Sequence, residues 1–192
     1  IAGTGDSDHD GDGGPALEAT FRDPNALASD KKGNIFIADT ANNLIRKIDT
    51  KGIVTTFAGN GEHADSGDGG SALEAAIRSM DDIEFSPEGE LHILGTNTHK
   101  VRKITKDGKI LTVAGKGYAG FFGDDGPATK AMLKNPAAIS FDSKGNLYIA
   151  DMGNNRIRKV DKKGIITTFA GTGKFGWGRT GETVEIYLQN FP

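Results

Sequence analysis

The sequence predicts an all-β protein: a β-propeller segment of four-stranded antiparallel blades, with three blades present. Three observations lead to this fold class. A long block of sequence repeats at a fixed period, glycines recur at fixed offsets inside each repeat, and short apolar runs alternate with turn residues. A repeat of this size indicates units that cannot bury their apolar faces alone and must stack on neighbours.

The repeat is 56 residues long. When residues 2–57 are laid on residues 114–169 without a gap, more than half of the positions are identical. The block that marks each start is Ala-Gly-x-Gly, found at Ala2–Gly5, Ala58–Gly61, Ala114–Gly117 and Ala170–Gly173. We call residues 2–57 unit one, 58–113 unit two and 114–169 unit three.

Each unit contains four short apolar runs, which in unit one are 26–30, 35–38, 44–48 and 53–58. Runs of this length bounded by Gly and Asn predict a β-meander. The second run is apolar on both alternating faces, so we expect it to be covered on both sides, as in a blade packed between two others. The turn glycines Gly33 and Gly52, with their counterparts in the other units, are expected to have positive φ.

These runs divide the chain into one propeller segment, 1–192. The blades are predicted at 21–57, 77–113 and 133–169, and 170–192 is the start of a further repeat. An insertion of about 20 residues precedes each blade; in units one and three its Gly-Pro-Ala sequence suits the first turn of a short helix.

Two stretches resemble the signature of NHL repeats: Gly33–Asp49 and Gly145–Asp161. The Gly-Asp-Gly-Gly-Pro-Ala insertion at 11–16 is similar to that of bacterial extracytoplasmic members. The resemblance implies a propeller, usually six-bladed, whose channel-end surfaces bind proteins, RNA or small ligands, and a few relatives are lyases or lactonases. It also implies an extracellular or periplasmic location.

Three blades are half of a six-bladed ring and cannot close one. We therefore expect the missing partners to be the remaining blades of the same propeller or a second copy of the chain. The expected function is a binding or scaffolding module for a protein or a small ligand. One alternative is a metal-assisted lyase or lactonase that uses the channel carboxylates Asp82 and Glu84; another is a structural subunit of an extracellular assembly. The small residues at the same positions in the other blades count against an enzyme: Ala26, Ala28, Ala138 and Ser140.

The composition of the chain limits the classes of partner and the kinds of site that we expect. The net charge of −3 argues against non-specific binding to nucleic acid or to an anionic membrane surface. No apolar run approaches the roughly 20 residues that a spanning helix needs, so we expect no membrane insertion. The chain has no cysteine, which excludes disulfides, thiolate catalysis and Cys-type zinc sites.

A candidate calcium site lies in the first insertion. Asp6, Asp8 and Asp10 are followed by Gly11, which is the Asp-x-Asp-x-Asp-Gly spacing of a calcium loop. The twelfth position of that loop is Leu17 instead of Glu, and units two and three lack the triplet. A solvated acidic loop is therefore the alternative reading.

Unit two departs from the pattern around its basic residues. Gly95 and Thr105 replace two aspartates, so His99, Lys100 and Arg102 are predicted to form an unpaired basic spot that binds an anionic ligand. The same unit gains acids in its first strand, including Asp82 and Glu84. These acids either pair with Arg102 and Lys103 or line a site for a polar ligand or metal. A further change is His92, which takes an aromatic slot of the other blades and is expected to be packed there.

Overall fold

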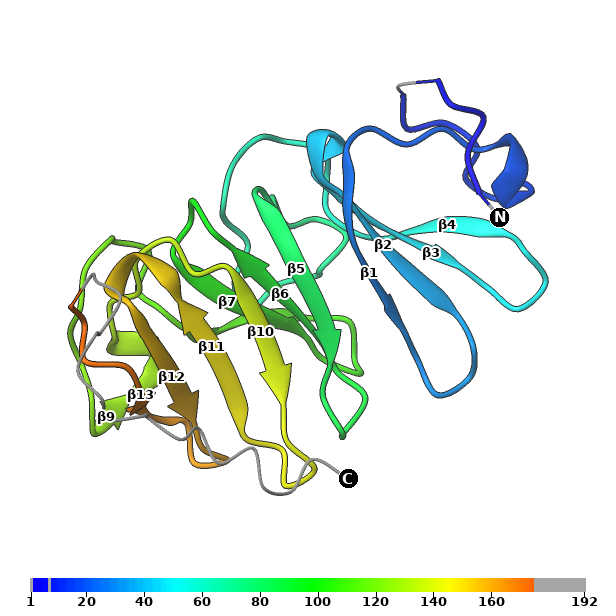
Figure 1. Ribbon diagram of the computed structural model, residues 1–192. Coiled ribbons are helices and arrows are strands. Elements are labelled where there is room, and N and C mark those ends of the chain that lie inside the picture. The colour runs from blue at the N-terminus through cyan, green and yellow to red at the C-terminus, as the bar shows by residue number, and fades with distance from the viewer. Residues whose placement is uncertain (1, 7, 175–192) are drawn as a thin grey trace, which may run out of the picture.

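The computed structural model describes residues 2–6 and 8–174, and its strands form three antiparallel sheets joined in chain order (Figure 1). The first sheet contains β1 (Pro24–Ser29), β2 (Ile35–Asp39), β3 (Leu44–Ile48) and β4 (Val54–Ala58). The second contains β5 (Met80–Phe85), β6 (Leu91–Gly95), β7 (Lys100–Ile104) and β8 (Ile110–Ala114). The third contains β10 (Ala138–Phe141), β11 (Leu147–Asp151), β12 (Arg156–Val160), β13 (Ile165–Ala170) and the short β9 (Gly126–Pro127).

In the described part of the chain, four short 3₁₀ helices accompany the strands. Two are the short helices expected in the insertions after Gly-Pro-Ala. The other two lie in the turns between the second and third strands of blades one and three. The four helices are η1 (Ala16–Glu18), η3 (Ala128–Lys130), η2 (Thr40–Asn42) and η4 (Met152–Asn154). The predicted further repeat at 170–192 falls mostly outside the part of the chain that the structure describes.

The three sheets are arranged as propeller blades, which confirms the predicted fold class. Consecutive strands are hydrogen-bonded neighbours in each sheet, and β5 packs against both β1 and β10. Figure 1 shows the three first strands as adjacent inner strands, with the later strands of each sheet fanning away. The total of six blades in a closed ring stays a prediction.

The core lies between blades, as expected for strands apolar on both faces. One face of blade one packs on the opposite face of blade two, and blade two packs on blade three in the same way. The first interface includes Phe36, Ala38, Ile45 and Ala58 against Met80, Ile83 and Leu91, and the second includes Leu94, Val101 and Ala114 against Ile139, Leu147 and Ile149.

The turn glycines have the conformation that the sequence predicts. Gly33, Gly89 and Gly145 have φ of 84°, 84° and 80°. L-residues with a side chain adopt this region only at a cost. The second set of turn glycines, Gly52, Gly108 and Gly164, has φ of 80°, 79° and 78°. Each glycine therefore closes a tight turn between neighbouring strands of a blade.

The two end faces of the segment expose side chains that are buried between blades. Leu27 of β1 is 68% exposed, whereas its counterpart Ile83 in blade two is 3% exposed. On the other end face Phe169 is 54% exposed, while its counterpart Phe57 packs against the core between blades one and two. Within residues 2–6 and 8–174, both end faces thus carry the side chains of a blade interface with no neighbouring blade packed on them.

Candidate functional site

The insertion loops and the turns between second and third strands meet at one end of the segment, which we call the loop end. The insertion loops are residues 5–10, 61–66 and 117–122. Asn42 donates a hydrogen bond to the Asp8 carbonyl at 2.7 Å, and Asn154 donates one to the Gly120 carbonyl at the same distance. Asn43 donates to the carbonyl of Gly61 at 3.2 Å. Side-chain amides thus fix each insertion loop to a blade.

In blade one and in blade three, a buried arginine anchors the insertion to its own blade. In blade one, Arg46 is fully buried, with Nη2 2.7 Å from Asp12 and Nη1 3.6 Å from Asp39. The second oxygen of Asp12 accepts the N–H of Thr56 on β4. A buried charge is tolerated only when it is paired and hydrogen-bonded. This arginine clamp therefore ties together β2, β3, β4 and the insertion.

Blade three repeats the clamp with Arg158, which lies 2.7 Å from Asp124 and 3.3 Å from Asp151. Burial acts to raise the pKa of Asp124, but hydrogen bonds from Thr168 and Arg158 and the charge of Arg158 lower it overall. Asp124 therefore stays ionised as a partner for the arginine.

The prediction that Arg102 is unpaired is wrong. The Arg102 Nη2 atom lies 2.6 Å from Asp68, and Nη1 lies 3.1 Å from Asp65. Backbone carbonyls of Ser66 and Ala76 accept the remaining hydrogen bonds, so every nitrogen of this buried guanidinium is engaged. The carboxylate lost from the strand at Gly95 is supplied by Asp65 in the insertion loop. Comparison of the three insertions shows that unit two has an acid at position 65 where units one and three have His9 and Phe121.

The other proposed explanation, that Asp82 or Glu84 pairs with these cations, is also wrong. The Lys103 Nζ atom pairs with Glu90 at 2.7 Å. Asp82 instead accepts the N–H of Ile139 at 2.8 Å, and Glu84 lies 3.4 Å from the Ser140 hydroxyl. Both acids therefore connect β5 to β10, the first strand of the next blade. Burial raises the pKa of Glu84, and the neighbouring charge of Asp82 adds to the increase.

The two other residues of the predicted basic spot also have partners. The Lys100 Nζ atom lies 2.7 Å from Asp65. His99 has a φ of 53° and its Nδ1 accepts the N–H of Asn135 at 3.2 Å. His99 thus bridges blades two and three at the loop end. Ligand binding by His99 and Lys100 stays a prediction.

The structure does not gather the predicted calcium ligands into a metal site. Asp6 contacts Thr4 Oγ1 at 3.2 Å, and Asp8 accepts the N–H of His9 at 2.9 Å. Asp10 is exposed, and its N–H donates to Thr20 Oγ1. Among residues 2–6 and 8–174, no three His, Cys, Asp or Glu side chains are grouped so as to hold a metal ion. Calcium binding stays a prediction.

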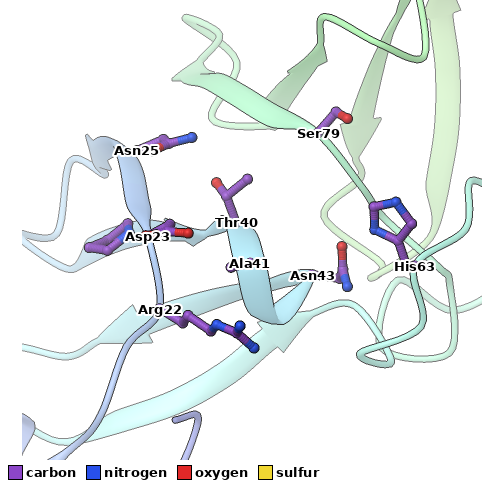
Figure 2. A pocket seen from close by; sticks show the side chains of 9 residues that line it. Arg22, Asp23, Asn25, Thr40, Ala41, Asn43, His63 and Ser79 are labelled. Carbon is purple, nitrogen blue, oxygen red and sulfur yellow. The ribbon is translucent and has the colours of Figure 1, made fainter. Parts of the chain in front are cut away.

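A polar cavity of about 550 Å³ opens at the loop end between blades one and two (Figure 2). The turn between β2 and β3 contributes Thr40, Ala41 and Asn43; the segment before β5 contributes His63 and Ser79. The remaining lining residues come from the entry to β1: Arg22, Asp23, Pro24 and Asn25. Hydroxyl, amide and basic groups of this kind suit a small polar ligand. Sequence patterns do not predict this cavity, because its lining comes from three separated segments.

The insertion loops differ in chemistry although the blades that hold them are alike. Loop 5–10 is acidic through Asp6, Asp8 and Asp10, and loop 61–66 carries Glu62 and Asp65. Loop 117–122 has no acid and carries Tyr118, Phe121 and Phe122 instead. Tyr118 is 69% exposed and Phe122 is 62% exposed. The loop end therefore combines an acidic region and an aromatic region.

Solved structures of propeller proteins share this architecture. An auxiliary nutrient binding protein from Bacteroides ovatus matches 80% of this chain and 37% of its own, with a TM-score of 0.58 and 19% identity. A virginiamycin B lyase from Staphylococcus aureus matches 76% of this chain and 40% of its own, with a TM-score of 0.50 and 20% identity. These likenesses support the fold alone.

Sequence comparison identifies the family. Teneurin-m from Drosophila melanogaster is 32% identical over 181 residues, which cover 87% of this chain and 6% of the relative. Teneurin-3 from Mus musculus is 27% identical over 246 aligned positions, covering 84% and 9%. The chain thus spans under a tenth of the length of these relatives. The family model of the teneurin NHL domain matches residues 2–67 and 119–180. The chain therefore belongs to the NHL-repeat family of propellers, in the group defined by the teneurin NHL domain.

Proposed function

We propose that the chain is part of a protein-binding propeller that presents the loop end to a partner protein. The proposal rests on one observation: the three insertion loops differ in the chemistry of their side chains, whereas the blades that hold them have the same fold. A rigid scaffold with variable loops is the arrangement by which many folds build binding surfaces. Membership of the teneurin NHL group and the exposed aromatic side chains of loop 117–122 support the same function.

We further propose that another blade covers each end face, contributed by the same polypeptide or by a second copy. The exposed Leu27 and Phe169 occupy positions that are packed between blades elsewhere in the segment. Interface positions left exposed at both ends of a repeat array indicate units that stack on further neighbours. Such a ring would be displayed outside the cytoplasm, as the extracytoplasmic resemblance implies. No helix in the described part of the chain is long and apolar enough to cross a membrane.

The enzymatic alternative has less support. Asp82 and Glu84 are engaged with β10, and blades one and three offer Ala26, Ala28 and Ala138 at corresponding positions. A binding surface accounts for the loop end without requiring a set of converging catalytic side chains.

Site-specific photo-crosslinking tests the proposal. A photoreactive amino acid is placed at Tyr118 in the complete natural protein, expressed in its native host. A second version carries it at Lys144, an exposed residue in the turn between β10 and β11 at the opposite end of the same blade. We expect a discrete adduct with another protein from Tyr118 and none from Lys144. Adducts of equal yield from both positions, or none from Tyr118, would contradict a binding role for the loop end.

A further inference from the structure

Loop 117–122 forms a cationic aromatic surface with two neighbouring basic residues, Lys116 and Arg156. The Arg156 guanidinium carbon lies 3.8 Å from the centre of the Phe121 ring. The Lys116 Nζ atom lies 5.8 Å from the centre of the Phe122 ring. Cations at these distances are attracted to the ring faces. The surface therefore presents two positive charges beside exposed apolar rings, with no acid in the loop itself.

Arg156 is held in place before any partner arrives. Its Nη1 donates to the Asn154 carbonyl at 2.9 Å and its Nη2 to the Thr172 carbonyl at 3.0 Å. The side chain lies against Gly173, where a side chain would overlap the guanidinium. A guanidinium has five N–H donors, so donors remain on Arg156 after these two bonds. Among the described residues, no carboxylate lies within ion-pair distance of Arg156.

Blade two shows what this position accepts when an acid is available. Lys100 is the counterpart of Arg156, and Asp65 is the counterpart of Phe121. In blade two the Asp65 carboxylate binds both Lys100 and Arg102, at 2.7 and 3.1 Å. Phe121 replaces that carboxylate in unit three, while the cation is retained. The internal comparison therefore identifies a carboxylate as the group that would complete the site on Arg156.

We propose that this surface binds a carboxylate-bearing segment of a partner protein, in which an Asp or Glu is flanked by apolar side chains. The carboxylate pairs with Arg156, and the flanking side chains pack on Tyr118 and Phe122. The inference rests on the proposed function and names the partner chemistry at one loop. Two cations are too few to hold a nucleic-acid backbone, which is bound through many phosphate contacts. Aromatic and Arg anchors of this kind are enriched at protein interfaces.

Saturation-transfer NMR on the complete natural protein provides the test. The probe is acetyl-Leu-Glu-Leu-amide, and the reference is acetyl-Leu-Gln-Leu-amide, which differs only in the carboxylate. We expect the Glu peptide to bind about tenfold more tightly, as for a hydrogen bond to a charged group. Arg156→Leu, which copies Leu44 of blade one, should remove that preference. Phe121→Asp, which copies Asp65, should remove it as well by supplying an internal carboxylate.

Two variants keep the result interpretable. Lys144→Leu removes an exposed cation at the opposite end of the blade and should leave the preference unchanged. Tyr118→Glu changes a side chain that is 69% exposed, so it should preserve folding and still weaken the Glu peptide. Equal affinity for both peptides, or a preference unchanged in Arg156→Leu, would overturn the inference. Tighter binding of a single-stranded RNA oligonucleotide at this surface would overturn it too. A partner crosslinked from Tyr118 together with equal peptide affinities would refute the inference and leave the proposed function intact.

Discussion

Units two and three satisfy the same buried arginine with carboxylates from different places. In unit three the second carboxylate is Asp151, at the end of β11; in unit two it is Asp65, in the insertion loop. Each buried arginine keeps two carboxylates, although a strand position has changed to Gly95. The comparison teaches that the repeat preserves the charge balance of the clamp and not the identity of each position.

The same substitution separates the loop surfaces of the two units. The Asp65 carboxylate pairs with Lys100 and Arg102, so loop 61–66 is tied to β7. Phe121 cannot accept a hydrogen bond, so Arg156 stacks on the ring and retains unused donors. The exchange of Asp65 for Phe121 therefore separates a structural loop from a candidate binding loop on two blades of the same fold.

The clamp arginine of blade three should show the largest effect. Arg158→Leu leaves Asp151 and Asp124 without their cation, and Asp151 is fully buried. An uncompensated buried charge costs about 3–5 kcal/mol, so the free energy of unfolding should fall by that amount. Urea unfolding of the complete protein measures it. A loss under about 1 kcal/mol would show that the clamp does not stabilise the blade.

His92 should give blade two a pH dependence that its neighbours lack. Burial lowers the pKa of His92 to about 4, opposed by the Glu90 carbonyl and carboxylate and by Glu88 and reinforced by Lys103. The unfolded chain binds the proton below about pH 6.5, whereas the folded chain does not until about pH 4. Titration of His92 therefore leaves the free energy of unfolding unchanged above about pH 6.5. As the pH drops toward 4, this titration lowers the free energy of unfolding by about 3 kcal/mol at most.

Comparison with His92→Phe isolates this contribution, because Phe36 occupies the slot in blade one. The difference in unfolding free energy between the natural protein and the variant should change between pH 7 and pH 4. The opposing contribution of Glu84, whose raised pKa favours the folded state at low pH, is present in both proteins and cancels. A difference that is constant with pH would refute the assignment.

Moving the carboxylate back to the strand tests the central comparison of units two and three. Asp65→Asn should lower the unfolding free energy by about 2 kcal/mol, because Arg102 loses one of its two carboxylates. Adding Gly95→Asp and Thr98→Asn should restore most of the loss. The second change is needed because a side chain at 95 would overlap Thr98, and Asn154 is the residue that donates to Asp151 in blade three. Thermal unfolding of the natural protein and the three variants of the cycle measures the rescue. Additive losses would contradict the interchange.

Arg156→Leu should show the smallest effect on stability. Its guanidinium lies at the surface on Phe121 and has no ion pair among the described residues, so the unfolding free energy should change by less than about 1 kcal/mol. Urea unfolding beside Arg158→Leu gives the comparison on one blade. If Arg156→Leu lowered the unfolding free energy as much as Arg158→Leu does, Arg156 would belong to the residues that stabilise the blade.

The sequence predicted the blades well, because their strands and turns follow from local periodicity. The 56-residue repeat, the four runs in each unit and the positive φ of Gly33 and Gly52 all follow from short-range patterns. The prediction failed at Arg102, whose partner Asp65 is 37 residues away in the sequence. Alignment of the repeats showed which acids were lost at Gly95 and Thr105, but not which acid in a three-dimensional turn would replace them.

The candidate site was harder to predict for the same reason. The residue pattern places the acids gained in β5 near Arg102, because both belong to unit two. In the structure Asp82 and Glu84 point across to β10, and the cavity in Figure 2 collects residues from three segments. Contacts between neighbouring blades depend on how the blades stack, which the residue pattern within one unit does not specify.

A loop graft tests most directly the claim that the clamps hold the frame while the loops carry the binding chemistry. Residues 117–122 are replaced by the sequence of residues 61–66, which has the same length and brings the Asp65 carboxylate to position 121. The graft is examined by urea unfolding and by the pair of Glu and Gln peptides. We predict an unfolding free energy within about 1 kcal/mol of the natural protein and complete loss of the preference for the Glu peptide. Loss of folding, or an unchanged preference for the Glu peptide, would contradict the separation of frame and loop.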